Sequence, residues 1–302
     1  MSGQLLVTGT LGFDTITNCR GRAEGVVGGS GSYSSIAASY FCDVKLIGVI
    51  GTDFGQRHLK HFKKNKIDMR GVEVVQGKSF AWAANYDKDF KNAFTERTDL
   101  NVFGGYKPKI IKEYKNCRNI FLDNIDPGMQ LSLISQMKNP NLIACDTMNL
   151  WINNYPSLVK KMLKFADILL VNEAEARSIT GEYNLITAGK KLLQMGAGHV
   201  IIKLGPNGSM LVSPLGLCQM PPALVENIYD TTGAGDTFGG ALSGYLANQK
   251  NWETLKNLKT AMACGTVMAS FNIESFSVDR LSSLTKRQIN ARLKQYVKSI
   301  CF

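Results

Sequence analysis

The sequence lacks the features that mark secreted, metal-clustering and membrane-spanning chains. Its seven cysteines form no C-x-x-C pair, so neither a zinc site nor a disulfide framework is indicated, and reduced thiols are expected. The N-terminus has no basic flank followed by an apolar stretch, and no apolar run approaches the roughly 20 residues that cross a bilayer. We therefore expect a cytoplasmic chain without a signal peptide or a membrane partner.

Two common nucleotide-binding signatures are also missing. The chain contains no G-x-x-x-x-G-K-[ST] motif. A glycine-rich stretch begins at Gly28, but it does not complete G-x-G-x-x-G because Ser34 stands at the third glycine position. An NAD-dependent enzyme is therefore not supported.

The charge balance favours small anionic ligands. The 302 residues carry a formal charge of +11, and the 44% hydrophobic fraction is typical of a globular chain able to bury a sizeable core. Such a balance suits nucleotides or sugar phosphates. Because the lysines are scattered rather than clustered, we do not expect nucleic acid as a partner.

The C-terminal two thirds of the chain show the rhythm of a parallel sheet. Short apolar strands at 119–122, 142–145, 168–171 and 200–203 alternate with helical segments. Since the carboxyl ends of such strands share one edge, the polar residues that follow them should gather there and could hold Mg²⁺ through waters. Taken singly, each is also an ordinary loop or N-cap residue; they are Asn124, Asp126, Asp146, Asn149, Asn172, Glu173 and Glu175.

The N-terminal part holds a candidate acceptor site. Gln4–Thr8 is predicted to be a buried strand, and Asp14 beyond its end could hold substrate hydroxyls or be an exposed turn aspartate. A polar hairpin follows, and a later strand places Phe80, Trp82, Ala84 and Tyr86 on one side. That aromatic side is either packing between hairpins or a lid that stacks on a ring-shaped substrate. His58 and His61 are interpreted as a surface pair rather than a metal site.

The stretch from Asp230 to Thr237, DTTGAGDT, predicts a loop that becomes a helix near Gly233. A helix start offers free backbone N–H groups and partial positive charge, so it attracts anions. Asp236 would lie in the first turn, beside that anion site. An anion cradle next to a carboxylate suits phosphoryl transfer, although an acidic residue capping a helix gives the same pattern.

A glycine turn at Gly205 to Gly208 lies between two predicted strands and could border a nucleotide or be a plain hairpin. Together these motifs resemble the ribokinase-like, or PfkB-type, family of carbohydrate and nucleoside kinases. The resemblance rests on Asp230–Thr237, the pair Gly28-Gly29, the N-x-x-E motif at Asn172–Glu175 and the glycine turn, in the family's order.

The resemblance implies an α/β fold: a three-layer α/β/α sandwich with a mostly parallel central sheet and a small β-sheet lid. The core would comprise residues 1–12, 28–76 and 101–302, and the lid 13–27 and 77–100. It also implies transfer of the γ-phosphoryl group of ATP, with Mg²⁺, to a hydroxyl of a small sugar or sugar-like substrate. The alternatives are a nucleoside kinase and a non-catalytic ligand-binding protein on the same scaffold.

The family also implies roles for individual residues. Asp236 would be the catalytic base, and the amides of Gly233, Ala234 and Gly235 the anion hole. The substrate would bind Asp14, Gly28, Gly29, Tyr33, Trp82 and Asn124. ATP would border Lys203, Gly205, Gly208, Thr232 and Asn172. Glu175, through water, and Asp146 would serve Mg²⁺.

Two further implications concern specificity and partners. Tyr33 stands where many sugar kinases of the family have asparagine, which changes what the pocket can hydrogen-bond. Some members bind a monovalent cation near the position of Asp230, and some pair into homodimers through the lid.

Overall fold

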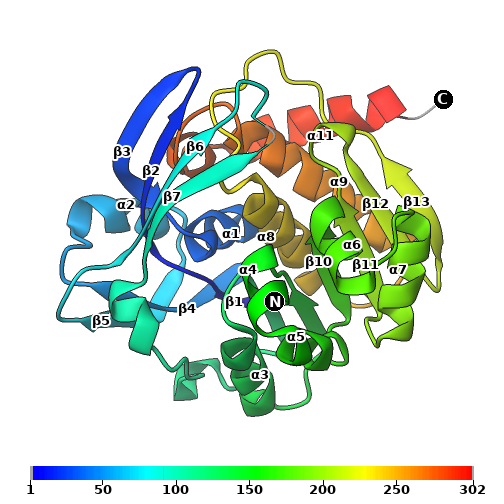
Figure 1. Ribbon diagram of the computed structural model, residues 1–302, viewed down its shortest axis with the longest axis horizontal. Helices are drawn as coiled ribbons and strands as arrows, with labels where there is room; N and C mark the ends of the chain where they lie inside the picture. The colour runs from blue at the N-terminus through cyan, green and yellow to red at the C-terminus, as the bar shows by residue number, and fades with distance from the viewer. Residues whose placement is uncertain (1–2, 91, 301–302) are drawn as a thin grey trace.

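The computed structural model describes residues 3–90 and 92–300, which form two β-sheets (Figure 1). The strands of the larger sheet are β1 (Gln4–Thr8), β4 (Asp43–Gly51), β5 (Asp68–Val75), β8 (Asn119–Leu122), β9 (Leu142–Cys145), β10 (Ile168–Asn172), β11 (His199–Lys203), β12 (Ser209–Ser213) and β13 (Gly216–Met220). Their order across the sheet is β13-β12-β11-β10-β9-β8-β1-β4-β5. Pairing is parallel from β5 to β11, and β12 and β13 add antiparallel strands at one edge.

Both faces of this sheet are covered, as expected for parallel strands that are apolar throughout. Leu5 and Val7 of β1 belong to one hydrophobic core and Leu6, between them, to the other, because alternate side chains point to opposite faces. The first core is closed by α1 (Ser30–Ser39), α2 (Gln56–Lys64), α8 (Ala234–Ala247), α9 (Leu255–Asn272), α10 (Asp279–Ser282) and α11 (Lys286–Ile300). The second is closed by α3 (Pro127–Gln136), α5 (Pro156–Leu163), α6 (Glu173–Thr180) and α7 (Leu185–Gln194), with α4 (Asn149–Asn154) packed on α5 and α6.

The smaller sheet is the lid. Its strands are β2 (Gly12–Asn18), β3 (Gly21–Gly28), β6 (Phe80–Tyr86) and β7 (Ala93–Asp99), in the order β3-β2-β6-β7. Strands β2 and β6 pair in parallel, and β2 continues directly from the carboxyl end of β1. Figure 1 shows this sheet standing beyond the layer that holds α1 and α8. The predicted three-layer α/β/α sandwich with a small β-sheet lid is confirmed.

The interpretation of two histidines as a surface pair is wrong. His58 and His61 are both buried on α2. The His58 ring lies edge-on to Phe13 at 4.8 Å, and His61 Nδ1 lies 2.9 Å from the hydroxyl of Ser282. The buried face of α2 contains few aliphatic residues, so its sequence has the pattern of a solvated basic helix.

Within residues 3–90 and 92–300, no helix is both long and apolar enough to cross a membrane.

Candidate active site

The loop before α8 presents the start of that helix without a side-chain cap. Gly233 adopts a left-handed backbone (φ 71°), and a Cβ there would lie 2.4 Å from the ring of Tyr33. The Ala234 amide donates to the Thr231 carbonyl at 3.2 Å, and the N-cap residue, Gly233, has no side chain that could accept from the first turn. The helix start therefore combines the positive end of the helix dipole with a glycine conformation that larger residues resist.

Three aspartates meet beside this helix start. Oxygens of Asp123, Asp146 and Asp236 all lie within 4.8 Å of one another, contributed by the ends of β8 and β9 and by the first turn of α8. Asp146 and Asp236 were predicted site residues, but Asp123 was missed. Asp123 directly follows the apolar run of β8 and is fully buried. The sequence feature that could have identified it is its position immediately after the strand, one residue before Asn124.

Lys203 supplies the positive charge of this group. Its Nζ atom lies 2.5 Å from Oδ2 of Asp146, and a Cβ on Gly235 would be 3.3 Å from the same ammonium group. The pKa of Lys203 is raised because the attraction of Asp146, Glu175 and Asp236 outweighs the burial that would lower it. A protonated lysine therefore lies within the carboxylate group, next to the amides of α8.

The carboxyl of Asp236 holds its proton more tightly than an ordinary aspartate. Burial, followed by the charge of Asp146, raises its pKa to about 6, while Lys203 acts in the opposite direction. Burial also raises the pKa of Asp123 well above its usual range. A base with a pKa near 6 is ionised at neutral pH and is better suited to accept a proton than a solvated carboxylate.

The N-x-x-E motif closes the start of α6 as a capping box. Both carboxylate oxygens of Glu175 accept from Asn172, one from its backbone amide and one from its side chain, each at 2.7 Å, while the Asn172 side chain accepts from the Glu175 amide. Burial raises the pKa of Glu175 to about 7, against the lowering effect of Lys203. The motif thus fixes a buried carboxyl beside Lys203.

Asp14, on strand β2 of the lid, is also buried. A Cβ on Gly28 would clash with its carboxyl group, so glycine is required there. The backbone of Gly29 and the hydroxyl of Tyr33, at 3.5 Å, both interact with the carboxyl, yet burial raises its pKa to about 8. Tyr33 therefore spans two predicted parts of the site, with its ring on Gly233 and its hydroxyl toward Asp14.

The lid turns an aromatic face toward the same region. Trp82 pairs with Asp14 across β6 and β2, so the two side chains share one face of the sheet. Its indole N–H donates to Thr95 at 3.2 Å. Tyr86, four residues along the same strand, hydrogen-bonds the Thr232 hydroxyl at 2.9 Å. Asn124 accepts from the indole of Trp151 at 2.8 Å and lies near Ser30 of α1.

The glycine turn after β11 has the predicted form. Gly205 and Gly208 both have positive φ, 54° and 90°, and flank a short 3-10 turn, η3 (Gly205–Asn207). A Cβ on Gly208 would collide with the carbonyl of Met220. This turn joins β11, which carries Lys203 at its end, to the antiparallel edge of the sheet.

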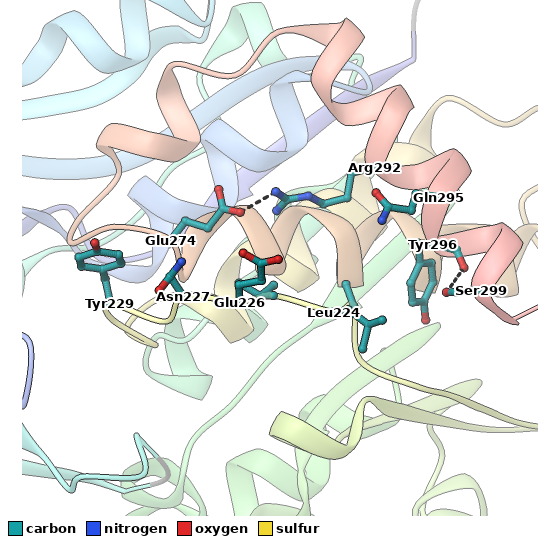
Figure 2. Close-up of a pocket in the computed structure, with 11 residues that line it drawn as sticks. Leu224, Glu226, Asn227, Tyr229, Glu274, Arg292, Gln295, Tyr296 and Ser299 are labelled. Atoms are coloured by element: carbon teal, nitrogen blue, oxygen red, sulfur yellow. Dashed lines mark hydrogen bonds and ion pairs between the residues drawn. The ribbon is translucent and has the colours of Figure 1, made fainter.

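A cavity of about 420 Å³ lies elsewhere, between the segment after β13 and helix α11 (Figure 2). None of the predicted site residues lines it. Figure 2 shows the ion pair of Glu274 with Arg292 on one wall and Tyr296 on the other. Tyr229 also lines the cavity and directly precedes Asp230, so the cavity adjoins the loop that leads into α8.

The model of the pfkB family of carbohydrate kinases matches residues 14–285 of this sequence. The chain belongs to that family. The matched range includes Asp14, Lys203 and Asp236, so it covers the geometry described above. This pfkB chain is a ribokinase-like, ATP-binding phosphotransferase that acts on an alcohol group.

Its relatives within the family divide between two acceptor classes. The chain is 30% identical over 253 residues to the cytidine kinase of Thermococcus kodakarensis, covering 80% of this chain and 88% of that one. It is 27% identical over 226 residues to the ribokinase of Lactococcus lactis, covering 72% and 71% of the two chains. The acceptor of this pfkB kinase is a sugar or a nucleoside.

Solved structures share the fold along nearly the whole chain. The Burkholderia thailandensis nucleoside kinase in complex with ADP-inosine superposes with a TM-score of 0.81 at 16% identity, covering 97% of this chain and 96% of that one. The ribokinase of Cryptococcus neoformans in complex with ADP gives 0.78 at 19% identity, covering 96% and 100%.

Proposed function

We propose that this protein transfers the γ-phosphoryl group of ATP to a hydroxyl of a small sugar, with Asp236 as the base. The observation that carries the proposal is the position of the Asp236 carboxylate in the first turn of an uncapped helix, with Lys203 paired to Asp146 beside it. A phosphate at the helix start would lie next to that carboxylate. The lid, residues 13–27 and 77–100, would close over the acceptor.

The reaction follows from this arrangement. Asp236 takes the proton of the acceptor hydroxyl as its oxygen forms a bond to the γ-phosphorus. The bond from that phosphorus to the β,γ-bridging oxygen breaks, and ADP leaves with the electron pair. The amides of Gly233 to Gly235 and the ammonium group of Lys203 stabilise the charge on the transferred group. Positioned base catalysis is worth about 10²–10⁴-fold.

The residues present fit a divalent cation. Asp123 Oδ2 is buried and has no hydrogen-bond partner within the described residues, and a carboxylate oxygen of Asp123 lies within 4.8 Å of oxygens of Asp146 and Asp236. Carboxylate oxygens are the ligands Mg²⁺ prefers, often with waters between. Asp123 and Asp146, with Glu175 through water, would hold the ion, which would neutralise charge that develops on the phosphates.

A monovalent cation near Asp230 is also part of the proposal. Asp230 Oδ2 and the side-chain oxygen of Asn272 are buried, and neither has a hydrogen-bond partner in the described part of the chain. Asp230 Oδ1 holds the Thr232 amide at 2.9 Å, so a cation here would order the loop before α8. A fructokinase from Vibrio cholerae has been solved in a form with fructose, ADP and potassium ion bound.

The acceptor is proposed to be a small sugar because Tyr33 is committed to packing. Its ring covers Gly233, which leaves the hydroxyl, and not the ring face, toward Asp14. A nucleoside is the second candidate, favoured by Trp82 on the same lid face as Asp14 and by the similarity to a cytidine kinase. A non-catalytic role is disfavoured because Asp236 and Glu175 are both present.

ADP release measured over a panel of pentoses, hexoses and nucleosides tests the proposal, with Asp236→Asn as the blank. Turnover with at least one sugar, absent in the variant, is the expected result. Turnover with nucleosides alone would assign the second candidate.

Strand β7 is exposed along nearly its whole length, so it could pair with the lid of a second copy of the protein. The mass of the protein in solution tests that proposal.

A further inference from the structure

The tip of the lid is joined to the loop before α8 at several points. Asn18 donates to the carbonyl of Tyr229 at 2.8 Å, and Arg20 donates to the carbonyl of Ile228 at 2.9 Å. Thr231 donates to the carbonyl of Phe90 at 3.1 Å. These contacts link lid residues to a loop that lies more than 140 positions later in the sequence.

The contact between Tyr86 and Thr232 differs from the others because both partners are side chains next to the site. The two hydroxyls lie 2.9 Å apart, and Thr232 is buried. Asp230 accepts from the Thr232 amide at 2.9 Å, and Asn272 donates to the Thr232 carbonyl at 2.7 Å. The amide, carbonyl and hydroxyl of Thr232 thus each form a hydrogen bond, and the lid residue Tyr86 is the partner in one of the three.

The residue after Thr232 is Gly233, whose left-handed conformation sets the direction of the first amides of α8. A change in the backbone of Thr232 would therefore turn the amides that face the transferred phosphate. Tyr86 shares its strand with Trp82, which faces the acceptor region beside Asp14. One rigid strand consequently reaches both the acceptor and the residue that orients the helix start.

We infer that Tyr86 is a positioning residue that couples closure of the lid to the geometry of the phosphate-binding amides, an inference that rests on the proposed kinase function. With the acceptor bound and the lid closed, the Tyr86–Thr232 hydrogen bond fixes the amides for transfer. With the lid open, the bond is broken and the helix start loses that constraint, so transfer of the γ-phosphoryl group to water is slow while no acceptor is present.

The test compares Tyr86→Phe, Thr232→Val and the double variant, with Tyr40→Phe as the control. Tyr40 donates its hydroxyl to the carbonyls of Leu281 and Leu284, neither of which belongs to the loop before α8, so this control also loses a tyrosine hydrogen bond. Each single variant should lower kcat by roughly two- to tenfold, the worth of one neutral hydrogen bond. The kcat of the double variant should be no lower than that of the more impaired single variant, because all three variants remove the same hydrogen bond.

Hydrogen exchange of the amides from 232 to 236 gives a second readout that does not need an acceptor. Exchange should be faster in Tyr86→Phe and Thr232→Val than in wild type or Tyr40→Phe. Additive losses in the double variant, or wild-type exchange in both single variants, would overturn the coupling. If Tyr86 acted on the acceptor alone, Tyr86→Phe would raise the acceptor KM and Thr232→Val would behave as wild type, which also overturns it. A wild-type protein inactive on every acceptor would instead contradict the proposed function, and the exchange comparison would still decide the coupling.

Discussion

The ammonium group of Lys203 lies 2.5 Å from Oδ2 of Asp146, and the two residues are 57 positions apart at the ends of strands β11 and β9. Both side chains are largely buried, with 18% and 2% of their surface exposed. The pair brings a positive charge into a group of carboxylates that would otherwise repel one another. It therefore bears on both the stability of the fold and the binding of phosphate.

Replacing Lys203 by methionine should destabilise the protein. The change leaves Asp146 buried without its partner, which typically costs about 3–5 kcal/mol of unfolding free energy. Lys191→Met is the matched control, because the Lys191–Glu182 pair is partly exposed, with 45% and 35% of the side chains accessible, and such pairs are worth about 0–1 kcal/mol. Urea titrations of both variants measure the difference, and equal losses would contradict the account.

Asp123→Asn should stabilise the protein, and increasingly so as the pH rises. Burial raises the folded-state pKa of Asp123 above its unfolded value, so its ionisation opposes folding. That penalty is absent below the unfolded pKa, near 4, and grows with pH until the folded pKa is passed. Thermal unfolding at pH 4.5 and pH 8 should show a small gain at the lower pH and a larger one at the higher. A loss of stability at pH 8 would contradict the account, because it would show that the folded protein stabilises the ionised Asp123 carboxylate.

The rate of phosphoryl transfer should fall on the acid side of neutrality. Asp236 must be ionised to accept a proton, and its pKa is raised to about 6. We therefore expect kcat to level off above about pH 7 and to fall about tenfold per pH unit well below pH 6. The profile is measured with saturating ATP and acceptor. A rate that stays constant down to pH 4.5 would show that a carboxyl of ordinary pKa, or no carboxyl, limits the reaction.

Trp82→Ala should weaken acceptor binding more than ATP binding. The ring lies on the lid face that carries Asp14, and stacking on a substrate ring is typically worth about 1 kcal/mol or more. The acceptor KM should rise at least fivefold, and a larger rise for nucleosides than for sugars would indicate that the ring stacks on a base. Phe94→Ala is the control, since Phe94 on β7 is 60% exposed. Equal effects of both changes would mean that Trp82 serves only the lid's stability.

Much of the fold and part of the site could be predicted because they rest on local patterns. The βαβ rhythm and the DTTGAGDT stretch each have a direct physical reading, and the structure shows the sheet, the lid and the helix start where these patterns lie. Roles for Asp236, Glu175 and the glycines came from the resemblance and stay predictions. The structure adds that the substrate and phosphate residues lie close together.

The rest depends on contacts that no local pattern encodes. Asp123 was missed because a single aspartate after a strand looks like any loop residue until Asp146 and Asp236 are placed beside it. The pairing of Lys203 with Asp146 joins the ends of two different strands. The Tyr86–Thr232 bond joins residues 146 positions apart, and it required the lid to be placed over the loop.

Turnover of Asp236→Asn tests the central claim most directly. Asp126→Asn is the matched control, because Asp126 caps α3 and takes no part in the proposed reaction. Both variants should keep the wild-type far-ultraviolet spectrum and bind ATP. We predict that Asp236→Asn loses about 10²–10⁴-fold in kcat while Asp126→Asn stays within about twofold of wild type. Near-normal turnover of Asp236→Asn would contradict its assignment as the base that deprotonates the acceptor.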